Sequence, residues 1–342
     1  MGAPIATDVA VVGGGPAGSA TAIACAVRGL RVVLFERDLF ASERPGETLH
    51  PGIEPLLAQL GIADRMSPVV GARHNGIWIE WGGSRRFDPF GADDSGPWTG
   101  FQVWRADFDA LLIRRARELG VDVRQPCTVT GIIDGPDGPA GVTTAEGVVP
   151  ARIVVDATGR TRWLGRTLGI ASPSRSPRFF VRYGYAKGAC PERERAPLLV
   201  GNASGWTWTA MVRPDTYQWT RLAFDGSQPP RDWMPDEFCH LTPTGRSRGA
   251  DVTWRMADAV AKPGWFMVGD AAGILDPTSS HGVLRAIVSG MTAGHLIGAV
   301  LRSGAPPAGA AIAYQEWFAA WFNADATRLS QFYRNLNVVG LT

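Results

Sequence analysis

Two short apolar runs near the amino-terminal end of the sequence flank a segment with helical character. Residues 8–12 and 31–36 are rich in valine and other apolar side chains, and both are short enough to be buried strands. Residues 16–28 between them predict a helix. A strand, a helix and a second strand in this order predict a βαβ unit and therefore a parallel sheet.

Similar patterns recur further along the chain. Residues 152–159 and 265–273 predict two more buried strands, and each run ends in a turn that contains glycine and aspartate. Residues 105–120 predict an amphipathic helix, because apolar side chains recur there every three or four positions. Residues 308–333 predict a terminal helical segment on the same ground.

Residues 71–99 and 171–254 have a different character, with short extended patterns and many aromatic, arginine and proline residues. Eight of the 13 tryptophans fall in these two stretches. We interpret the two stretches as one inserted antiparallel sheet that is interleaved with the parallel one.

The turn after the first strand has the spacing of a dinucleotide-binding loop. Gly13, Gly15 and Gly18 form the pattern G-x-G-x-x-G between a strand and a helix. This pattern allows a tight turn, close approach of a pyrophosphate and close packing of helix on strand. Glu36 and Arg37 close the second strand, where a carboxylate can accept both ribose hydroxyls of an adenosine.

A second signature decides which dinucleotide binds. In 269-GDAAGILDP-277, Gly269 and Asp270 follow a strand, and the next helix begins near Ser280 and Gly282. An acid at that strand end can bind a ribityl hydroxyl, and the helix amino terminus can face the pyrimidine edge of a flavin. An NAD dehydrogenase has no need of this second site, so the predicted cofactor is FAD.

The predicted fold class is α/β, with a Rossmann-type FAD-binding domain interleaved with an antiparallel β-sheet substrate domain and a short helical carboxyl terminus. The predicted boundaries are residues 1–70, 100–170 and 255–307 for the FAD-binding domain, 71–99 and 171–254 for the substrate domain, and 308–342 for the terminal helical segment.

Composition narrows the function classes. The formal charge is only +2, from 34 basic and 32 acidic residues, which gives no reason to expect nucleic acid or an anionic membrane as partner. The four cysteines lack metal-ligand spacing, so we predict no metal site and a reduced, cytoplasmic protein. No signal peptide is predicted. The long apolar stretch 282–301 carries Arg285 and His295, and we predict a buried helix there and not a membrane span.

Four segments carry a family resemblance: 9-VAVVGGGPAGSATA-22, 105-RADFDALL-112, 156-DATGR-160 and 268-VGDAAGILDPTSSHGV-283. They resemble the FAD-dependent monooxygenases of the aromatic hydroxylase type and the related tryptophan halogenases. Two further segments, 45-PGETLHPGIEPLLAQLG-61 and 278-TSSHGVLRAIVSGM-291, look most like flavoproteins that oxidise protein-bound tryptophan in tryptophylquinone biogenesis.

The resemblance implies roles for individual residues. Arg105 would reach the phosphate or ribityl part of FAD, and Asp156 would lie at the cofactor. Glu47 and His50 would lie near the flavin. For Arg105 a surface salt bridge, and for Glu47 a helix-capping role, remain open alternatives.

Two halogenase markers are altered in this chain. The halogenase pattern W-x-W-x-I-P is represented by Trp206 and Trp208, but Ala210 and Met211 replace its last two residues. The catalytic lysine of that family sits in a segment that resembles 72-ARHNGIWIEW-81, where this chain has His74. No lysine precedes Lys187. These departures disfavour halogenation.

The remaining chemistry of such flavins is transfer of a hydroxyl group from a C4a-hydroperoxide to an electron-rich ring. That reaction needs a base for the ring proton, and imidazole serves near neutral pH. The candidate bases are His281, His74 and His50; a structural role for each remains open. Trp206, Trp208 and Trp78 are the candidate substrate wall, with core packing as the alternative.

The sequence therefore predicts an FAD-dependent monooxygenase that hydroxylates an electron-rich aromatic ring, with an indole as the expected ring, either free or carried on a precursor peptide or protein. The alternatives are a flavin dehydrogenase or reductase, a halogenase, and a non-catalytic flavoprotein that binds a peptide. Asp156 is followed by no second acid before Arg160, which favours a separate flavin reductase as the electron source.

Overall fold

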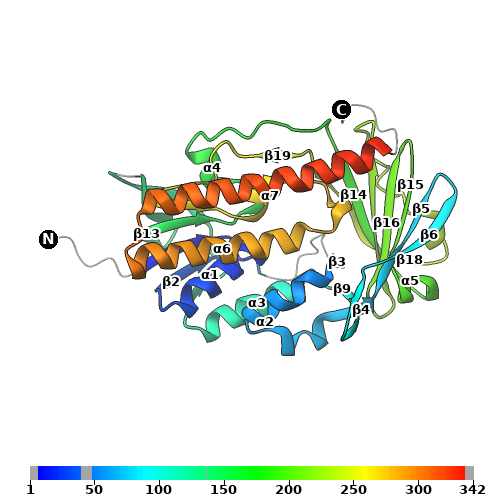
Figure 1. Cartoon of the computed structure of the whole chain (residues 1–342), viewed down its shortest axis with the longest axis horizontal. Helices are drawn as coiled ribbons and strands as arrows, with labels where there is room; N and C mark the ends of the chain where they lie inside the picture. The colour runs from blue at the N-terminus through cyan, green and yellow to red at the C-terminus, as the bar shows by residue number, and fades with distance from the viewer. Residues whose placement is uncertain (1–6, 40–47, 137, 336–342) are drawn as a thin grey trace.

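The computed structural model describes residues 7–39, 48–136 and 138–335. A parallel-sheet half and a half built on a large antiparallel sheet stand side by side, and the long helix α7 (Pro307–Asn335) reaches from the first to the second (Figure 1). The mixed α/β architecture is the one predicted.

The parallel half is organised by five strands in the order β10-β2-β1-β13-β21. Their bounds are β10 (Asp122–Arg124), β2 (Val32–Phe35), β1 (Thr7–Val12), β13 (Gly147–Asp156) and β21 (Trp265–Met267). All neighbouring pairs among them are parallel. The carboxyl ends of β1 and β13, which carry the glycine turn and Asp156, therefore meet at one edge of the sheet.

Three further strands extend this sheet with antiparallel pairs. They are β11 (Val129–Gly135), β12 (Gly138–Thr144) and β20 (Ala261–Lys262). The first part of β13 pairs with β12, and its second part pairs with β1 and β21. This one long strand therefore joins the antiparallel extension to the parallel strands.

The large antiparallel sheet contains seven strands in the order β18-β14-β17-β16-β15-β5-β6. Their bounds are β18 (Thr242–Asp251), β14 (Phe180–Lys187), β17 (Thr216–Ala223), β16 (Gly205–Arg213), β15 (Leu198–Asn202), β5 (Gly76–Trp81) and β6 (Ser84–Pro89). All seven come from the two stretches predicted to form the inserted sheet, although the pair β15–β5 is parallel. The exact domain boundaries stay a prediction.

Small sheets and short helices connect the two halves. The small sheets consist of β3 (Thr48–Leu49), β9 (Gly100–Val103) and β4 (Val70–His74), of β7 (Ala92–Asp93) and β8 (Gly96–Pro97), and of β19 (Arg255–Met256) and β22 (Gly273–Ile274). The shorter helices are α2 (Glu54–Gln59), α3 (Arg105–Glu118), α4 (Trp163–Thr167) and α5 (Pro191–Arg195).

Helices α1 (Pro16–Val27) and α6 (Gly282–Ser303) pack closely along their length. A Cβ added at Gly290 would lie 2.3 Å from the carbonyl oxygen of Ala17, and one at Gly294 would lie 2.6 Å from the Cβ of Ala24. These contacts advance in the same direction on both helices, so the helices run parallel. The glycines are needed because any side chain would force the backbones apart.

Within the described part of the chain, α6 is the one helix long and apolar enough to cross a membrane, and half of that apolar stretch is buried inside the protein. The face of α6 that carries Gly290 and Gly294 packs on α1, so this part of the helix is covered by protein. The structure therefore places α6 as the buried helix that the sequence predicts.

The carboxyl-terminal segment is helical, as predicted for residues 308–333. It is a single helix of 29 residues, α7 (Pro307–Asn335), which runs from the parallel half to the large antiparallel sheet (Figure 1). Near its start the Tyr314 hydroxyl donates to the Met267 carbonyl at 2.9 Å, and near its end the Tyr333 hydroxyl accepts from Trp206 Nε1 at 3.1 Å. α7 thus joins the two halves.

We predict that Gly290→Ala destabilises the fold. The new methyl group would overlap the Ala17 carbonyl, and overpacking of this kind costs roughly 1–3 kcal/mol. Gly309→Ala is the matched control, because Gly309 lies exposed on α7 with its nearest neighbouring atom 4.0 Å from an added Cβ. Urea unfolding should show a loss for the first variant and no loss for the second. Equal stabilities would contradict the proposed tight helix contact.

Candidate functional site

The glycine turn at the carboxyl end of β1 is shaped by close backbone contacts. Gly13 has a φ of +109°, and an added Cβ there would lie 2.4 Å from the Ala157 carbonyl oxygen. A Cβ on Gly18 would lie 1.9 Å from the Gly13 carbonyl oxygen. At Gly15, by contrast, an added Cβ would meet nothing within 4 Å. The space over Gly15 is therefore open at the amino terminus of α1, as binding of a pyrophosphate requires.

Glu36 lies at the end of β2 and is buried. Its Oε2 accepts a hydrogen bond from the Gly14 amide at 2.7 Å, and its Oε1 accepts one from the Asp38 amide at 2.9 Å. These bonds fix the carboxylate beside the turn, where a ribose would bind. Arg37 is exposed and pairs with Asp38 at 3.4 Å, and its contact with the cofactor stays a prediction.

The second signature forms a loop before α6. Gly269 has a φ of +59°, its amide donates to Ser289 Oγ at 2.9 Å, and Asp270 follows it in a short 3₁₀ turn. Ser280 has a φ of +53°, and the space beyond Gly282 is open. The first turn of α6 thus presents free backbone amides to the same side of the molecule as the first turn of α1.

These features fit FAD. Gly13, Gly15 and Gly18 would hold the pyrophosphate, Glu36 the adenosine ribose, and the start of α6 the pyrimidine edge of the flavin. The residue-level assignments stay predictions.

Two residues predicted to contact the cofactor, Arg105 and Asp156, form hydrogen bonds within the protein. Arg105 forms two hydrogen bonds to the buried Asp109, at 3.1 and 3.0 Å, which fix its guanidinium on α3. The Asp156 carboxylate accepts from the amide and hydroxyl of Thr158 and from the Leu164 amide. Asp156 therefore holds the turn before α4, and its contact with the cofactor stays a prediction. Glu47 lies outside the described residues.

The three predicted catalytic histidines lie together although they are far apart in the sequence. The rings of His50 and His281 have centroids 5.2 Å apart in an edge-to-face arrangement. Phe90 connects the third, because its ring lies 5.8 Å from that of His50 and 5.5 Å from that of His74. Phe90 was not predicted; an aromatic residue in a loop carries no periodic signal.

His74 is the most deeply buried of the three. It lies at the end of β4 with 4% of its surface exposed, and neither ring nitrogen has a hydrogen-bond partner in the described structure. Burial lowers its pKa to about 4, so the imidazole is neutral at physiological pH. The pKa of His50 is also lowered, first by burial and then by the neighbouring His281.

His281 caps the amino terminus of α6 and faces α7 on its other side. Its Nδ1 lies 3.7 Å from Oδ2 of Asp325, a buried aspartate that sequence reasoning missed. The signal for Asp325 in the sequence is the spacing of the apolar residues along α7. Asp325 occupies a position on the buried face of α7 between Phe322 and Leu329, where the pattern calls for an apolar side chain.

The predicted tryptophan wall needs correction. Trp206 is 1% exposed and its indole N–H is bonded to Tyr333, so it offers no surface to a substrate. Trp208 is half-buried on the same face of β16. In the sheet register Trp208 pairs with Leu199 and Trp78 with Leu198, so Trp78 points to the opposite face. Trp208 alone remains a candidate.

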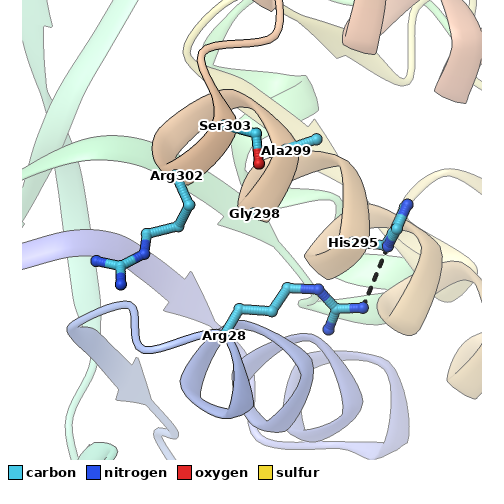
Figure 2. A pocket seen from close by; sticks show the side chains of 6 residues that line it. All are labelled: Arg28, His295, Gly298, Ala299, Arg302 and Ser303. Atoms are coloured by element: carbon cyan, nitrogen blue, oxygen red, sulfur yellow. Dashed lines mark hydrogen bonds between the residues drawn. The ribbon is translucent and has the colours of Figure 1, made fainter.

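A separate hollow lies at the far end of α6 (Figure 2). It measures about 290 Å³ and is lined by Arg28, His295, Gly298, Ala299, Arg302 and Ser303. The Arg28 guanidinium reaches His295 at 3.2 Å, whereas the Arg302 side chain points away from both. The charges do not converge on a ligand, and a structural role for His295 stays a prediction. In the described ranges no cluster of histidine, cysteine or acidic residues could hold a metal ion.

Comparison with known proteins agrees with this geometry. The family model described as "FAD binding domain" matches residues 6–181, more than half of the chain.

Two curated relatives are halogenases by name. The chain is 27% identical to the tryptophan 2-halogenase of Chondromyces crocatus, across 97% of this chain and 69% of the relative. It is 29% identical to the 1H-pyrrole-2-carbonyl-[peptidyl-carrier protein] brominase of Pseudoalteromonas luteoviolacea, across 85% of this chain and 77% of that one. Among solved structures, the flavin-dependent brominase Bmp2 superposes with a TM-score of 0.81 at 24% identity, covering 92% of this chain and 83% of the brominase, which shows a shared fold.

We predict that Gly15→Ala weakens FAD binding at least about tenfold and leaves the cofactor-free fold intact, since each tenfold loss corresponds to only about 1.4 kcal/mol. Gly15 has an ordinary extended conformation and the added methyl group would project into open space, where a pyrophosphate would otherwise lie. Flavin fluorescence titration measures the affinity, and thermal unfolding of the apoprotein measures the fold. Unchanged affinity would place the phosphates elsewhere.

We predict that His74 makes stability depend on pH. Its pKa is about 4 when folded against an ordinary 6.5, so only the unfolded chain gains a proton as the pH falls through 6.5. The contribution of the neutral His74 to the free energy of unfolding is present above that pH. It falls by roughly 2 kcal/mol between about pH 8 and about pH 5.

Urea unfolding at both pH values measures this loss. His74→Gln should flatten the pH dependence by that amount. His240→Gln is the matched control, because His240 is exposed and its Nε2 contacts the Ala189 carbonyl. An unaltered slope in His74→Gln would show that His74 is not buried as a neutral group.

Proposed function

Because this chain belongs to the FAD binding domain family and is an FAD-dependent oxidoreductase, we propose that it oxidises an electron-rich aromatic ring and transfers oxygen, not halogen, to that ring. The observation that carries the choice of oxygen is the state of His74. The halogenases that the sequence resembles have a lysine at this position, whereas His74 is a buried, neutral imidazole.

The charge at this position separates the two reactions. A lysine ammonium is a strong hydrogen-bond donor that can hold hypohalous acid beside a substrate. His74 carries no charge at neutral pH, and its ring packs against Phe90. A site without that cation lacks the group that directs the halogenating agent, so oxygen transfer is the chemistry that this arrangement supports.

The chain's own residues have distinct tasks in this reaction. Reduced FAD, when bound, supplies the electrons that activate dioxygen. His281, at the start of α6, is placed to accept the proton that the ring loses. Phe90 and the buried His74 would exclude water on the far side of His50, which contacts His281. The half-buried Trp208 would offer an aromatic face to the substrate.

The relatives support an aromatic substrate. One is named for tryptophan and another for a pyrrole held on a peptidyl-carrier protein, and both rings are electron-rich nitrogen heterocycles. We therefore propose an indole or a closely related ring, presented free or attached to a peptide or protein. A separate flavin reductase and a cytoplasmic location remain parts of this proposal.

Halogenation is the second candidate function, favoured by the names of the relatives. A dehydrogenase or reductase reaction is a third, since the FAD site by itself does not require oxygen transfer. The product distinguishes all three, because they add oxygen, add halogen or change only the hydrogen count.

We predict that the enzyme, supplied with reduced FAD, dioxygen and bromide, adds one oxygen atom and no bromine to an indole substrate. Mass spectrometry of tryptophan and of tryptophan-containing peptides after incubation measures the product. His281→Asn should lower kcat by roughly 10²–10⁴-fold, the usual contribution of a positioned base. His240→Asn is the matched control and should turn over like the parent enzyme.

Bromine in the product would establish the halogenase and overturn the interpretation of His74. Conversion without oxygen or bromine, sustained anaerobically by an artificial electron acceptor, would establish the dehydrogenase. Saturable peptide binding with no mass change would indicate a non-catalytic flavoprotein.

A further inference from the structure

Asp325 is a carboxylate on the face of α7 that otherwise packs into the core. The buried positions of the helix recur at Tyr314, Phe318, Phe322, Asp325 and Leu329, and Asp325 is 2% exposed. A buried carboxylate needs charged or hydrogen-bonding partners to be tolerated. Its presence at this position therefore needs an explanation from what surrounds it.

Two donors approach its buried oxygen. Asp325 Oδ2 lies 3.7 Å from His281 Nδ1 and 3.7 Å from Arg285 Nη1. Both distances suit an ion pair but exceed a hydrogen bond, and in the described structure Oδ2 has no hydrogen-bond partner. The other oxygen, Oδ1, lies 3.6 Å from the exposed Arg328.

We propose that Asp325 is the positioning residue for His281: its carboxylate selects the tautomer with the proton on Nδ1 and leaves the lone pair of Nε2 for the reacting substrate. This inference rests on the proposed role of His281 as the base.

Electrostatics favours this tautomer. A carboxylate attracts an N–H group and repels a nitrogen lone pair, and the low dielectric of a buried site strengthens both effects. Burial by itself would raise the pKa of Asp325, but the hydrogen-bonding capacity and charge of His281 and the charges of Arg285 and Arg328 lower it below the ordinary value. The group is therefore a carboxylate at neutral pH.

Two other groups that the described residues place near His281, Arg285 and His50, do not provide the same control. Arg285, on the next turn of α6, is a donor and cannot accept the Nδ1 proton. His50 contacts the edge of the His281 ring from the other side, at a centroid distance of 5.2 Å. Arg285 also faces Asp270 and Asp276, so it keeps acidic neighbours when Asp325 is neutralised. Asp325→Asn thus removes the negative charge, puts an N–H donor in place of one carboxylate oxygen, and leaves Arg285 with its other acidic neighbours.

The tautomer can be read directly by nitrogen-15 NMR of labelled histidine, because protonated and unprotonated ring nitrogens have well-separated shifts. The chain has only five histidines, and His281→Asn assigns the signal of interest. In the wild-type holoenzyme, at a pH where imidazoles are neutral, we expect the proton on Nδ1 of His281. In Asp325→Asn we expect a shift towards the Nε2-protonated form.

Arg328→Gln is the matched control, because Arg328 also contacts Asp325 but its side chain is 74% exposed. It should keep the wild-type tautomer. A wild-type His281 protonated on Nε2, or the same tautomer in wild type and Asp325→Asn, would overturn the proposal. If Asp325→Asn fails to fold, the wild-type spectrum still tests the proposal, because a proton on Nε2 of His281 would overturn it.

Kinetics adds a second readout. Asp325→Asn should lower kcat roughly 10- to 100-fold with KM nearly unchanged, the usual effect of removing a group that orients another. Arg328→Gln should change kcat less than about twofold, within what an exposed ion pair contributes. If no variant yields an oxygenated product, the proposed function fails, but the tautomer still tests Asp325 because it is measured without turnover.

Discussion

The close contact between α1 and α6 is the constraint on which the rest of the site depends. Gly290 lies against Ala17 and Gly294 against Ala24, so the two helices run parallel with their backbones nearly touching. With these residues opposite each other and a rise of 1.5 Å per residue, the amino terminus of α6 extends about 10 Å beyond the amino terminus of α1. Two positive helix ends therefore face the same side at different depths, which suits a ligand with phosphates at one point and a polar ring edge at another. A bulkier side chain at either glycine would move the histidine loop relative to the phosphate turn.

Helix α7 fixes the second half of the molecule to this arrangement. Near its end, the Tyr333 hydroxyl accepts from the Trp206 indole and donates to Asp276 at 2.8 Å, and Asp276 accepts from the Trp254 indole at 2.6 Å. This buried network connects the antiparallel sheet with the loop that leads to His281. The same helix brings Asp325 to that loop, so α7 links the position of the substrate sheet to the orientation of the proposed base.

The features predicted correctly from the sequence are those that depend on local patterns of residues. The strand–helix–strand unit, the glycine turn, Glu36 and the buried α6 follow from periodicity and spacing, and the structure contains all of them. The sequence also named His50, His74 and His281, but it could not show that they meet around Phe90, because that depends on how three separate segments pack. Alternation in β16 correctly put Trp206 and Trp208 on one face, yet burial of Trp206 depends on α7. The internal partners of Asp156 and Arg105, which are Leu164 and Asp109, become visible only in the folded chain, and the cofactor contacts of both residues stay predictions.

The central claim is that a neutral, buried His74 belongs to a site that transfers oxygen from dioxygen to an aromatic ring. The most direct measurement is the isotopic composition of the product formed under oxygen-18 dioxygen with reduced FAD and an indole substrate. The account predicts a product that carries the heavy isotope from dioxygen. A product that contains oxygen from water, or no added oxygen, would contradict it.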